Sequence, residues 1–142
     1  MMLFKDFFNK EKNSKVSYSA IVLDEESKKL LLSSPEIKKY LNHKHEIIAH
    51  HMTIKMGSLE NTPYENEEGT RETIIATHIG VSHDGNVVAV KVDGYSANQI
   101  PHVTISINRH ENAKPKDSNN IKNWKPLQSP IRLTGIVEQI RH

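Results

Sequence analysis

The sequence has no cysteine, and its 142 residues contain no run of about 18 apolar residues. A chain without cysteine can form neither a disulfide nor a thiolate metal site, so a reducing compartment such as the cytoplasm is the expected location. A chain without a long apolar run is expected to have no membrane-spanning segment. Aromatic residues are also scarce, at 6%, and Trp124 is the only tryptophan.

The remaining composition is that of an ordinary globular protein, with 36% apolar and 25% charged residues. The length suits one domain, spanning residues 1–142, and we expect a monomer. The formal charge of +2 and the nine histidines are compatible with a nucleotide or nucleic-acid ligand. They fall short of the strongly basic patch that a dedicated duplex-binding protein needs.

Hydrophobic periodicity and turn signals predict an α+β domain with mostly antiparallel strands and with helices mainly in the N-terminal half. Asp24 is the expected N-cap of the first helix, and Pro35 the first residue of the second. A short amphipathic arm is expected at residues 1–8, a solvated loop at 58–71 and an irregular loop at 109–130. The predicted helices are 25–32 and 35–41. The predicted strands are 16–23, 49–56, 72–82, 87–92, 102–108 and 131–140.

Two of these predicted strands carry the same motif, His-x-Thr-Ile, beginning at His51 and at His102. Residues i and i+2 of a strand point to the same face. His51 is therefore expected to lie beside Thr53, and His102 beside Thr104, while the apolar residues between them face a core. A single such motif is unremarkable, but two of them in predicted strands favour a functional site.

The chemistry of in-line displacement at phosphorus calls for these groups. One group must take a proton from the nucleophile, and another must give a proton to the leaving oxygen. Two histidines can do both without a metal, and threonine hydroxyls beside them can donate to the charged phosphoryl oxygens. His51, Thr53, His102 and Thr104 are thus the predicted catalytic residues, with either histidine able to act as the acid or the base.

With these paired motifs, the sequence resembles the two-histidine phosphoesterase superfamily. Most similar is the compact RNA-repair-like branch that includes the cyclic phosphodiesterase domain of fungal and plant tRNA ligases. The resemblance extends over the segments around 20–27, 77–82, 88–92 and 116–119 as well as both motifs. It implies a bilobal fold with two sheets around a central cleft, no metal or other cofactor, and RNA-type phosphodiester substrates. The second half here departs from that plan, because it has no clear helix.

Five further residues are candidates for binding a substrate. Lys55 and Ser106 each come one alternation after a motif threonine, which puts them on the same strand faces. Lys116 and Ser118, in the loop after the second motif, suit a rim that binds phosphate, although a solvated polar loop is an equal alternative. Tyr18 can stack on a base, or pack in the core.

Other residues favour structural roles. His43, His45, His50 and His51 form a local cluster, but position 49 is alanine where a His-Glu-x-x-His zinc motif needs histidine. On a regular strand His50 and His51 also point to opposite faces, so no metal site is predicted. Trp124 is expected to anchor the long loop on the body of the protein.

The leading prediction is therefore a metal-independent phosphodiesterase. Its candidate substrates are RNA 2',3'-cyclic phosphate ends, 2'-5' linkages and cyclic oligonucleotides. A non-catalytic module that binds RNA or a nucleotide in the same cleft is the main alternative, and a metal hydrolase built on the histidine cluster is a third. Turnover with a bell-shaped pH profile would favour the first, and inhibition by EDTA the third.

Overall fold

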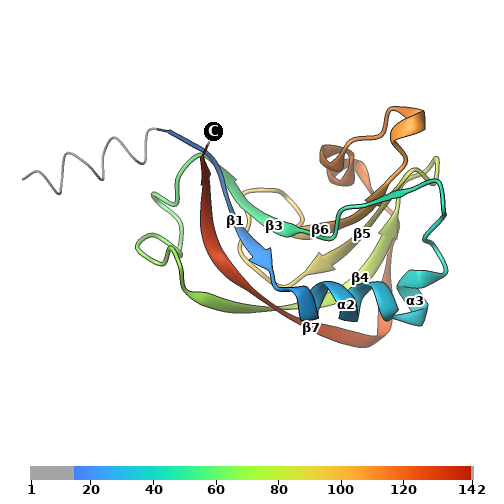
Figure 1. Ribbon diagram of the computed structural model, residues 1–142, viewed down its shortest axis with the longest axis horizontal. Helices are drawn as coiled ribbons and strands as arrows, with labels where there is room; N and C mark the ends of the chain where they lie inside the picture. The colour runs from blue at the N-terminus through green and yellow to red at the C-terminus, as the bar shows by residue number, and fades with distance from the viewer. Residues whose placement is uncertain (1–14, 142) are drawn as a thin grey trace, which may run out of the picture.

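The computed structural model describes residues 15–141, and strands dominate it (Figure 1). The arm predicted at residues 1–8 lies outside this range. The strands are β1 (Val16–Leu23), β2 (Glu46–Ile47), β3 (His51–Met56), β4 (Arg71–Val81), β5 (Val87–Val92), β6 (His102–Ile107) and β7 (Trp124–Arg141). The α-helices are α2 (Glu25–Ser33) and α3 (Pro35–Lys38), and the 3-10 turns are η1 (Arg109–Glu111) and η2 (Pro115–Asn120). Within residues 15–141, no helix has the length and apolarity to cross a bilayer.

Six of the strands close into one barrel, in the order β1, β3, β6, β5, β4, β7 and back to β1. All of these pairings are antiparallel, as predicted. The predicted pair of sheets around a cleft differs from this arrangement. Two separate sheets would leave free edges, whereas here β5 pairs with β6, and β1 pairs with β7. Hydrogen bonding across both junctions joins the strands into a single closed sheet.

The core of the protein fills the barrel, and alternate residues of each strand point into it. Ile21 and Leu23 of β1, for example, lie inward and are almost fully buried. The helices that follow β1 add Leu31 and Ile37 to the same cluster. The other interior positions are apolar as well, including Met52, Ile54, Ile74, Val88, Val90, Val103, Ile105, Leu133 and Val137. The polar residues that alternate with them therefore lie on the outside.

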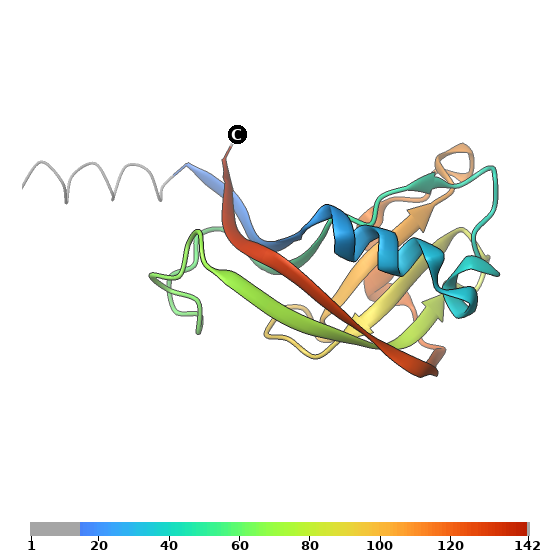
Figure 2. The same ribbon diagram turned by 60° about the horizontal axis from the view of Figure 1, so that its bottom comes forward.

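The last strand, β7, is longer than predicted and runs between β1 and β4 along the barrel (Figure 2). It begins at Trp124, inside the segment predicted as an irregular loop. Residues 124–126 pair with 78–80 of β4, so Pro126 and Pro130 lie within a strand. The loop predicted from the prolines at 109–130 was therefore wrong in its last part. A register shift after Ala76 interrupts the β4–β7 pairing, and such strand irregularities tolerate proline.

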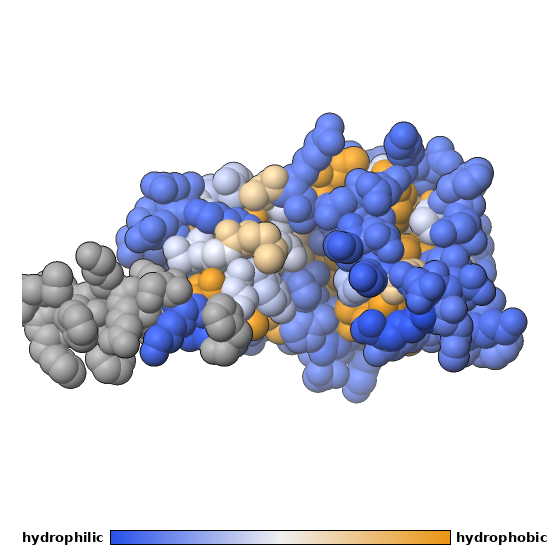
Figure 3. Space-filling view, turned by 90° about the horizontal axis from the view of Figure 1, so that it is seen from above, coloured by the Kyte–Doolittle hydropathy of each residue, from blue (hydrophilic) through white to orange (hydrophobic). Residues whose placement is uncertain are grey.

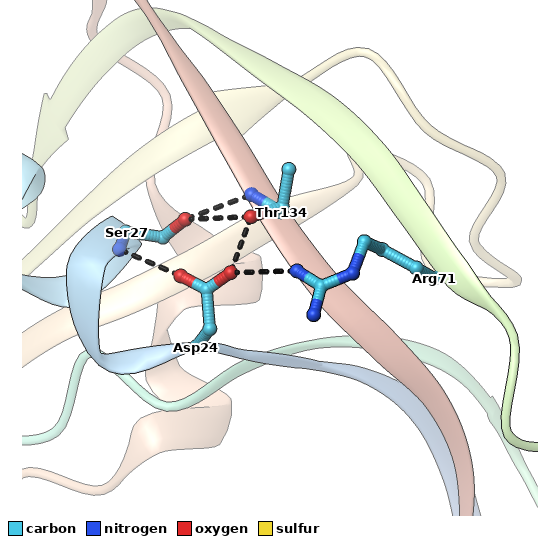
Figure 4. A network of polar contacts seen from close by, with 4 residues as sticks. All are labelled: Asp24, Ser27, Arg71 and Thr134. Atoms are coloured by element: carbon cyan, nitrogen blue, oxygen red, sulfur yellow. Dashed lines mark hydrogen bonds and ion pairs between the residues drawn. The ribbon is translucent and has the colours of Figure 1, made fainter.

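The carboxylate of Asp24 links α2 to the strands β7 and β4 (Figure 4). One oxygen accepts from the Ser27 amide at 2.8 Å, which caps α2 as predicted. The other accepts from the Thr134 hydroxyl of β7 and, at 3.3 Å, from Arg71 of β4. These hydrogen bonds, first that of Thr134, lower the pKa of Asp24 from its ordinary value of 3.8.

Replacing Asp24 by alanine should lower the free energy of unfolding by about 0.5–2 kcal/mol at pH 7, because the helix loses its cap. Since folding lowers the pKa of Asp24, the stabilisation by its charge is complete above the unfolded-state pKa. It is lost as the pH falls through the folded-state pKa. Urea unfolding at pH 7 and pH 3 should therefore show the gap between wild type and variant narrowing in acid. Asp24→Asn, which keeps a capping oxygen, is the control, and an unchanged gap at pH 3 would contradict the role of the charge.

Gly135 of β7 lies very close to β1. A Cβ atom at this position would lie 2.5 Å from the Val22 carbonyl oxygen and 2.9 Å from Ile21 Cγ2. Both are parts of the barrel wall that cannot move freely. Only glycine therefore lets β7 and β1 pair at this point.

Gly135→Ala should destabilise the protein by roughly 3 kcal/mol, the upper part of the range for overpacking. The matched control is Gly57→Ala, where no atom lies within 4 Å of the added Cβ and only the left-handed backbone (φ +98°) costs energy. That control should lose about 1–2 kcal/mol. Thermal and urea unfolding of the two variants compare the costs, and equal losses would exclude a special constraint at Gly135.

Candidate active site

The two His-x-Thr motifs lie on neighbouring antiparallel strands, β3 and β6. Met52 pairs with Val103, and continuing this register by one residue sets His51 across from Thr104 and Thr53 across from His102. Side chains opposite each other on such strands have Cβ atoms about 5 Å apart, and diagonal neighbours about 7–8 Å. The two histidines occupy one such diagonal. The structure thus brings all four predicted catalytic residues to one surface.

That surface is the outer face of the barrel rather than a cleft between two sheets. The protein is largely hydrophilic when seen from above, with apolar patches between the polar side chains (Figure 3). His51 and Thr53 are half-buried, whereas His102 and Thr104 are each only 8% exposed. The second motif is more enclosed because the loop after β6, which contains η2, packs against β6.

His102 is held in one tautomer by the backbone. Its Nδ1 lies 2.8 Å from the carbonyl oxygen of Ile100. A carbonyl has no proton to give, so Nδ1 carries the hydrogen and donates it. This leaves Nε2 as the ring atom that can exchange a proton with a substrate.

His51 is held by a second histidine. The Nδ1 atoms of His50 and His51 lie 2.9 Å apart, so one ring donates and the other accepts. This arrangement contradicts the prediction that the two side chains point to opposite faces. The physical reason is Ala49, which has a left-handed backbone with φ 38° and interrupts the strand between β2 and β3. The irregular backbone removes the strict alternation and lets His50 reach its neighbour.

The surroundings of His51 disfavour its charged form. Burial, and then the neighbouring His50 and His102, lower the pKa of His51 from 6.5 to about 4. The ring is therefore neutral at physiological pH. Its Nε2 faces away from the bond to His50, and a neutral ring in this position can accept a proton.

Ser118 joins the site through the second threonine. Its Oγ lies 2.7 Å from Thr104 Oγ1, which also lies 3.3 Å from the carbonyl oxygen of Pro115. Ser118 is buried, so this contact ties η2 to the floor of the site. Ser118 was predicted on a rim of the site, whereas its side chain is in direct contact with the motif residue Thr104.

The other predicted binding residues are distributed differently. The Tyr18 ring lies 5.3 Å from the His51 ring, centroid to centroid, so it borders the site. Burial alternates along β3 through Lys55, which is half-buried like His51 and Thr53, and the Lys55 ammonium donates to the Glu60 carbonyl at 2.7 Å. Ser106 is buried and contacts His45 Nδ1 at 3.1 Å.

The last predicted binding residue, Lys116, is exposed on η2. A cluster suited to a metal is not found among residues 15–141, where no three histidine, aspartate or glutamate side chains are grouped to hold an ion. His45 and His50 instead contact Ser106 and His51.

The chain was also compared with known proteins. No protein-family model matches it, and no similar curated protein was found. The interpretation of the site therefore depends on its geometry.

Removing the His50 ring should raise the pKa of His51. In the wild type, NMR titration of the His51 ring should give a pKa of about 4. His50→Ala removes one of the causes of the lowering, so the His51 pKa should rise toward 6.5 without reaching it, because burial and His102 still act. His110→Ala, at an exposed position, is the control and should change nothing. A His51 pKa near 6.5 in the wild type would contradict this description of the site.

Proposed function

We propose that this protein is a metal-independent phosphodiesterase acting on RNA-type phosphodiesters. The observation that carries the proposal is the reciprocal register of β3 and β6, which sets each motif histidine across from the other motif's threonine. Two proton-transfer groups and two hydroxyl groups then lie on one face of two neighbouring strands. The proposal agrees with the sequence resemblance to two-histidine phosphoesterases.

His51 is the proposed general base. It is neutral at physiological pH, and in this role its Nδ1–H donates to His50 Nδ1 while Nε2 takes a proton from the attacking water. His50 then acts as a positioning residue, because its contact orients the ring and accepts the hydrogen of the imidazolium that forms. A bound phosphodiester, being an anion, raises the proton affinity of His51 when it binds.

His102 is the proposed general acid. Its Nδ1–H donates to the Ile100 carbonyl, and that bond persists when Nε2 also carries a proton. The Ile100 carbonyl can only accept and leaves Nε2 of His102 to exchange a proton, whereas the partner of His51 is a second imidazole. The two motif histidines thus have different hydrogen-bond partners, and the proposed roles are based on this difference.

The reaction proposed for a 2',3'-cyclic phosphate is in-line hydrolysis. His51 removes a proton from water, the water oxygen bonds to phosphorus, and the bond from phosphorus to one ribose oxygen breaks. His102 gives its proton to that oxygen. The Thr53 hydroxyl donates to a non-bridging oxygen, which carries developing charge. The Thr104 hydroxyl does the same when it exchanges its hydrogen bond to the Pro115 carbonyl for one to the substrate. Tyr18, beside His51, is the surface on which a base stacks.

The same surface would also suit a module that binds an RNA end without turnover. The low exposure of His102, at 8%, is the observation that favours this second candidate. An enclosed general acid must still reach the leaving oxygen. Measured turnover decides between the two functions.

The test is hydrolysis of 2',3'-cyclic mononucleotides, 2'-5' oligonucleotides and cyclic dinucleotides, with and without EDTA. His51→Ala and His102→Ala should each lower kcat by roughly 10²–10⁴-fold, because each loses one proton-transfer step. The double variant should lose little more than either single variant, since the two groups act as a unit.

His110→Ala is the matched control, a histidine on η1 whose loss should leave turnover unchanged. Full activity of His51→Ala would overturn the assignment. Loss of activity in EDTA would favour a metal hydrolase instead. An absence of turnover with all three substrate classes, together with substrate binding that the His51→Ala change weakens, would favour the non-catalytic module.

A further inference from the structure

A hollow lies at one end of the barrel, and its lining includes neither His51 nor His102. Its volume is about 480 Å³, within the range of about 300–1,000 Å³ that is usual for small-ligand sites. The end of β4, the start of β7 and the segment after α3 form its walls. Barrel mouths are among the places where ligands commonly bind.

Its lining combines aromatic rings with positive charge. Tyr40 and Trp124 supply the rings, while Lys122, Lys125 and His83 supply the nitrogen groups. No acidic side chain is among the described residues that line this hollow. A ligand matching this lining carries a negative charge and a planar apolar ring.

The positive character continues beside Tyr40, whereas the hollow that adjoins on the other side, at His83, is lined by Asp84, Glu111 and Asp117. Lys39 lies over the Tyr40 ring, with its ammonium 5.2 Å from the ring centroid. An adjoining hollow of about 350 Å³ shares Tyr40 and Lys125 and contains Glu36. That carboxylate already accepts the backbone N–H of Gln128, at 2.8 and 3.0 Å, so a hydrogen bond offsets part of its charge.

Trp124, one of the two aromatic rings that line the hollow, is held in place by contacts within the protein. The Trp124 indole N–H donates to the Ile121 carbonyl at 3.2 Å. The ring also packs so closely on Gly80 that a Cβ there would lie 2.6 Å from it. Trp124 thus anchors the end of the long loop, as predicted from the sequence. A fixed ring loses little conformational entropy on binding, which favours its use as a stacking surface.

We propose that this hollow is a nucleotide-binding site, separate from the histidine site. The base packs against Tyr40 and Trp124, and the phosphate lies between Lys122 and Lys125. The ligand is either a free nucleoside phosphate or one nucleotide unit of an RNA strand, because both present the same chemistry. The loop that places Ser118 on Thr104 also supplies Lys122, four residues later, so one segment borders both sites.

The only tryptophan of the chain reports on this site directly. Trp124 fluorescence, excited at the red edge of its absorption, is titrated with AMP, adenosine, ribose 5-phosphate and a short single-stranded RNA. AMP or the RNA should change the signal in a saturable way. Adenosine and ribose 5-phosphate, which each lack one half of the ligand, should bind about tenfold or more weakly. Binding of AMP identifies a free nucleotide as sufficient, whereas binding of RNA alone identifies a strand.

Lysine variants distinguish binding at this hollow from nonspecific electrostatic attraction between the protein and the phosphate. Lys122→Gln/Lys125→Gln should weaken binding about tenfold or more, because it removes the phosphate contacts. Lys28→Gln/Lys29→Gln on α2 removes the same charge elsewhere and should leave binding unchanged. Circular dichroism checks that both variants are folded.

Three results would overturn the proposal. These are no saturable change with either AMP or RNA, an equal loss in both lysine variants, and loss of the signal in His51→Ala/His102→Ala. The last result would place the ligand at the histidine site. Because fluorescence needs no turnover, an inactive enzyme with intact Trp124 binding would refute the proposed catalysis and support this site.

Discussion

The pairing of β3 with β6 is the constraint on which the candidate site depends. Met52 and Val103 face each other across these strands and are fully buried in the barrel. A slip of one residue in either strand would turn that strand's histidine into the apolar core and its apolar residue to solvent, at a cost of several kcal/mol. Core packing therefore sets the register that aligns His51 with Thr104. The geometry proposed for catalysis therefore follows from the burial of Met52 and Val103, which lie between the proposed catalytic residues.

The two motifs have the same histidine and threonine side chains, but their histidines have different hydrogen-bond partners. His102 donates to a backbone carbonyl, which is a partner that cannot titrate. His51 contacts His50, which can, and its pKa is lowered to about 4 by burial and by the two neighbouring histidines. The register of the two motifs is thus nearly symmetric, whereas the hydrogen-bond partners of their histidines differ. The proposed acid–base catalysis uses this difference, because it needs a neutral group at one position, and His51 is neutral at physiological pH.

Several features of the fold were predictable because they depend on local patterns. The strands, the Asp24 cap and the hairpin around Asp84-Gly85 follow from alternation, capping and turn chemistry. The barrel closure, the early start of β7 and the position of His50 were predicted wrongly or not at all. The closure depends on pairing between strands far apart in the sequence, and the other two depend on irregularities, the register shift after Ala76 and the left-handed Ala49.

The sequence by itself determined which residues alternate with the core, and hence that His51 and Thr53 share a face, as do His102 and Thr104. It determined this because a strand has a period of two whatever its partners are. Only the tertiary structure decided that the two faces are the same face, that Ser118 reaches Thr104, and that Tyr40 and Trp124 line one hollow. These contacts join segments far apart in the chain, and such pairing is set by packing the whole core rather than by any local pattern.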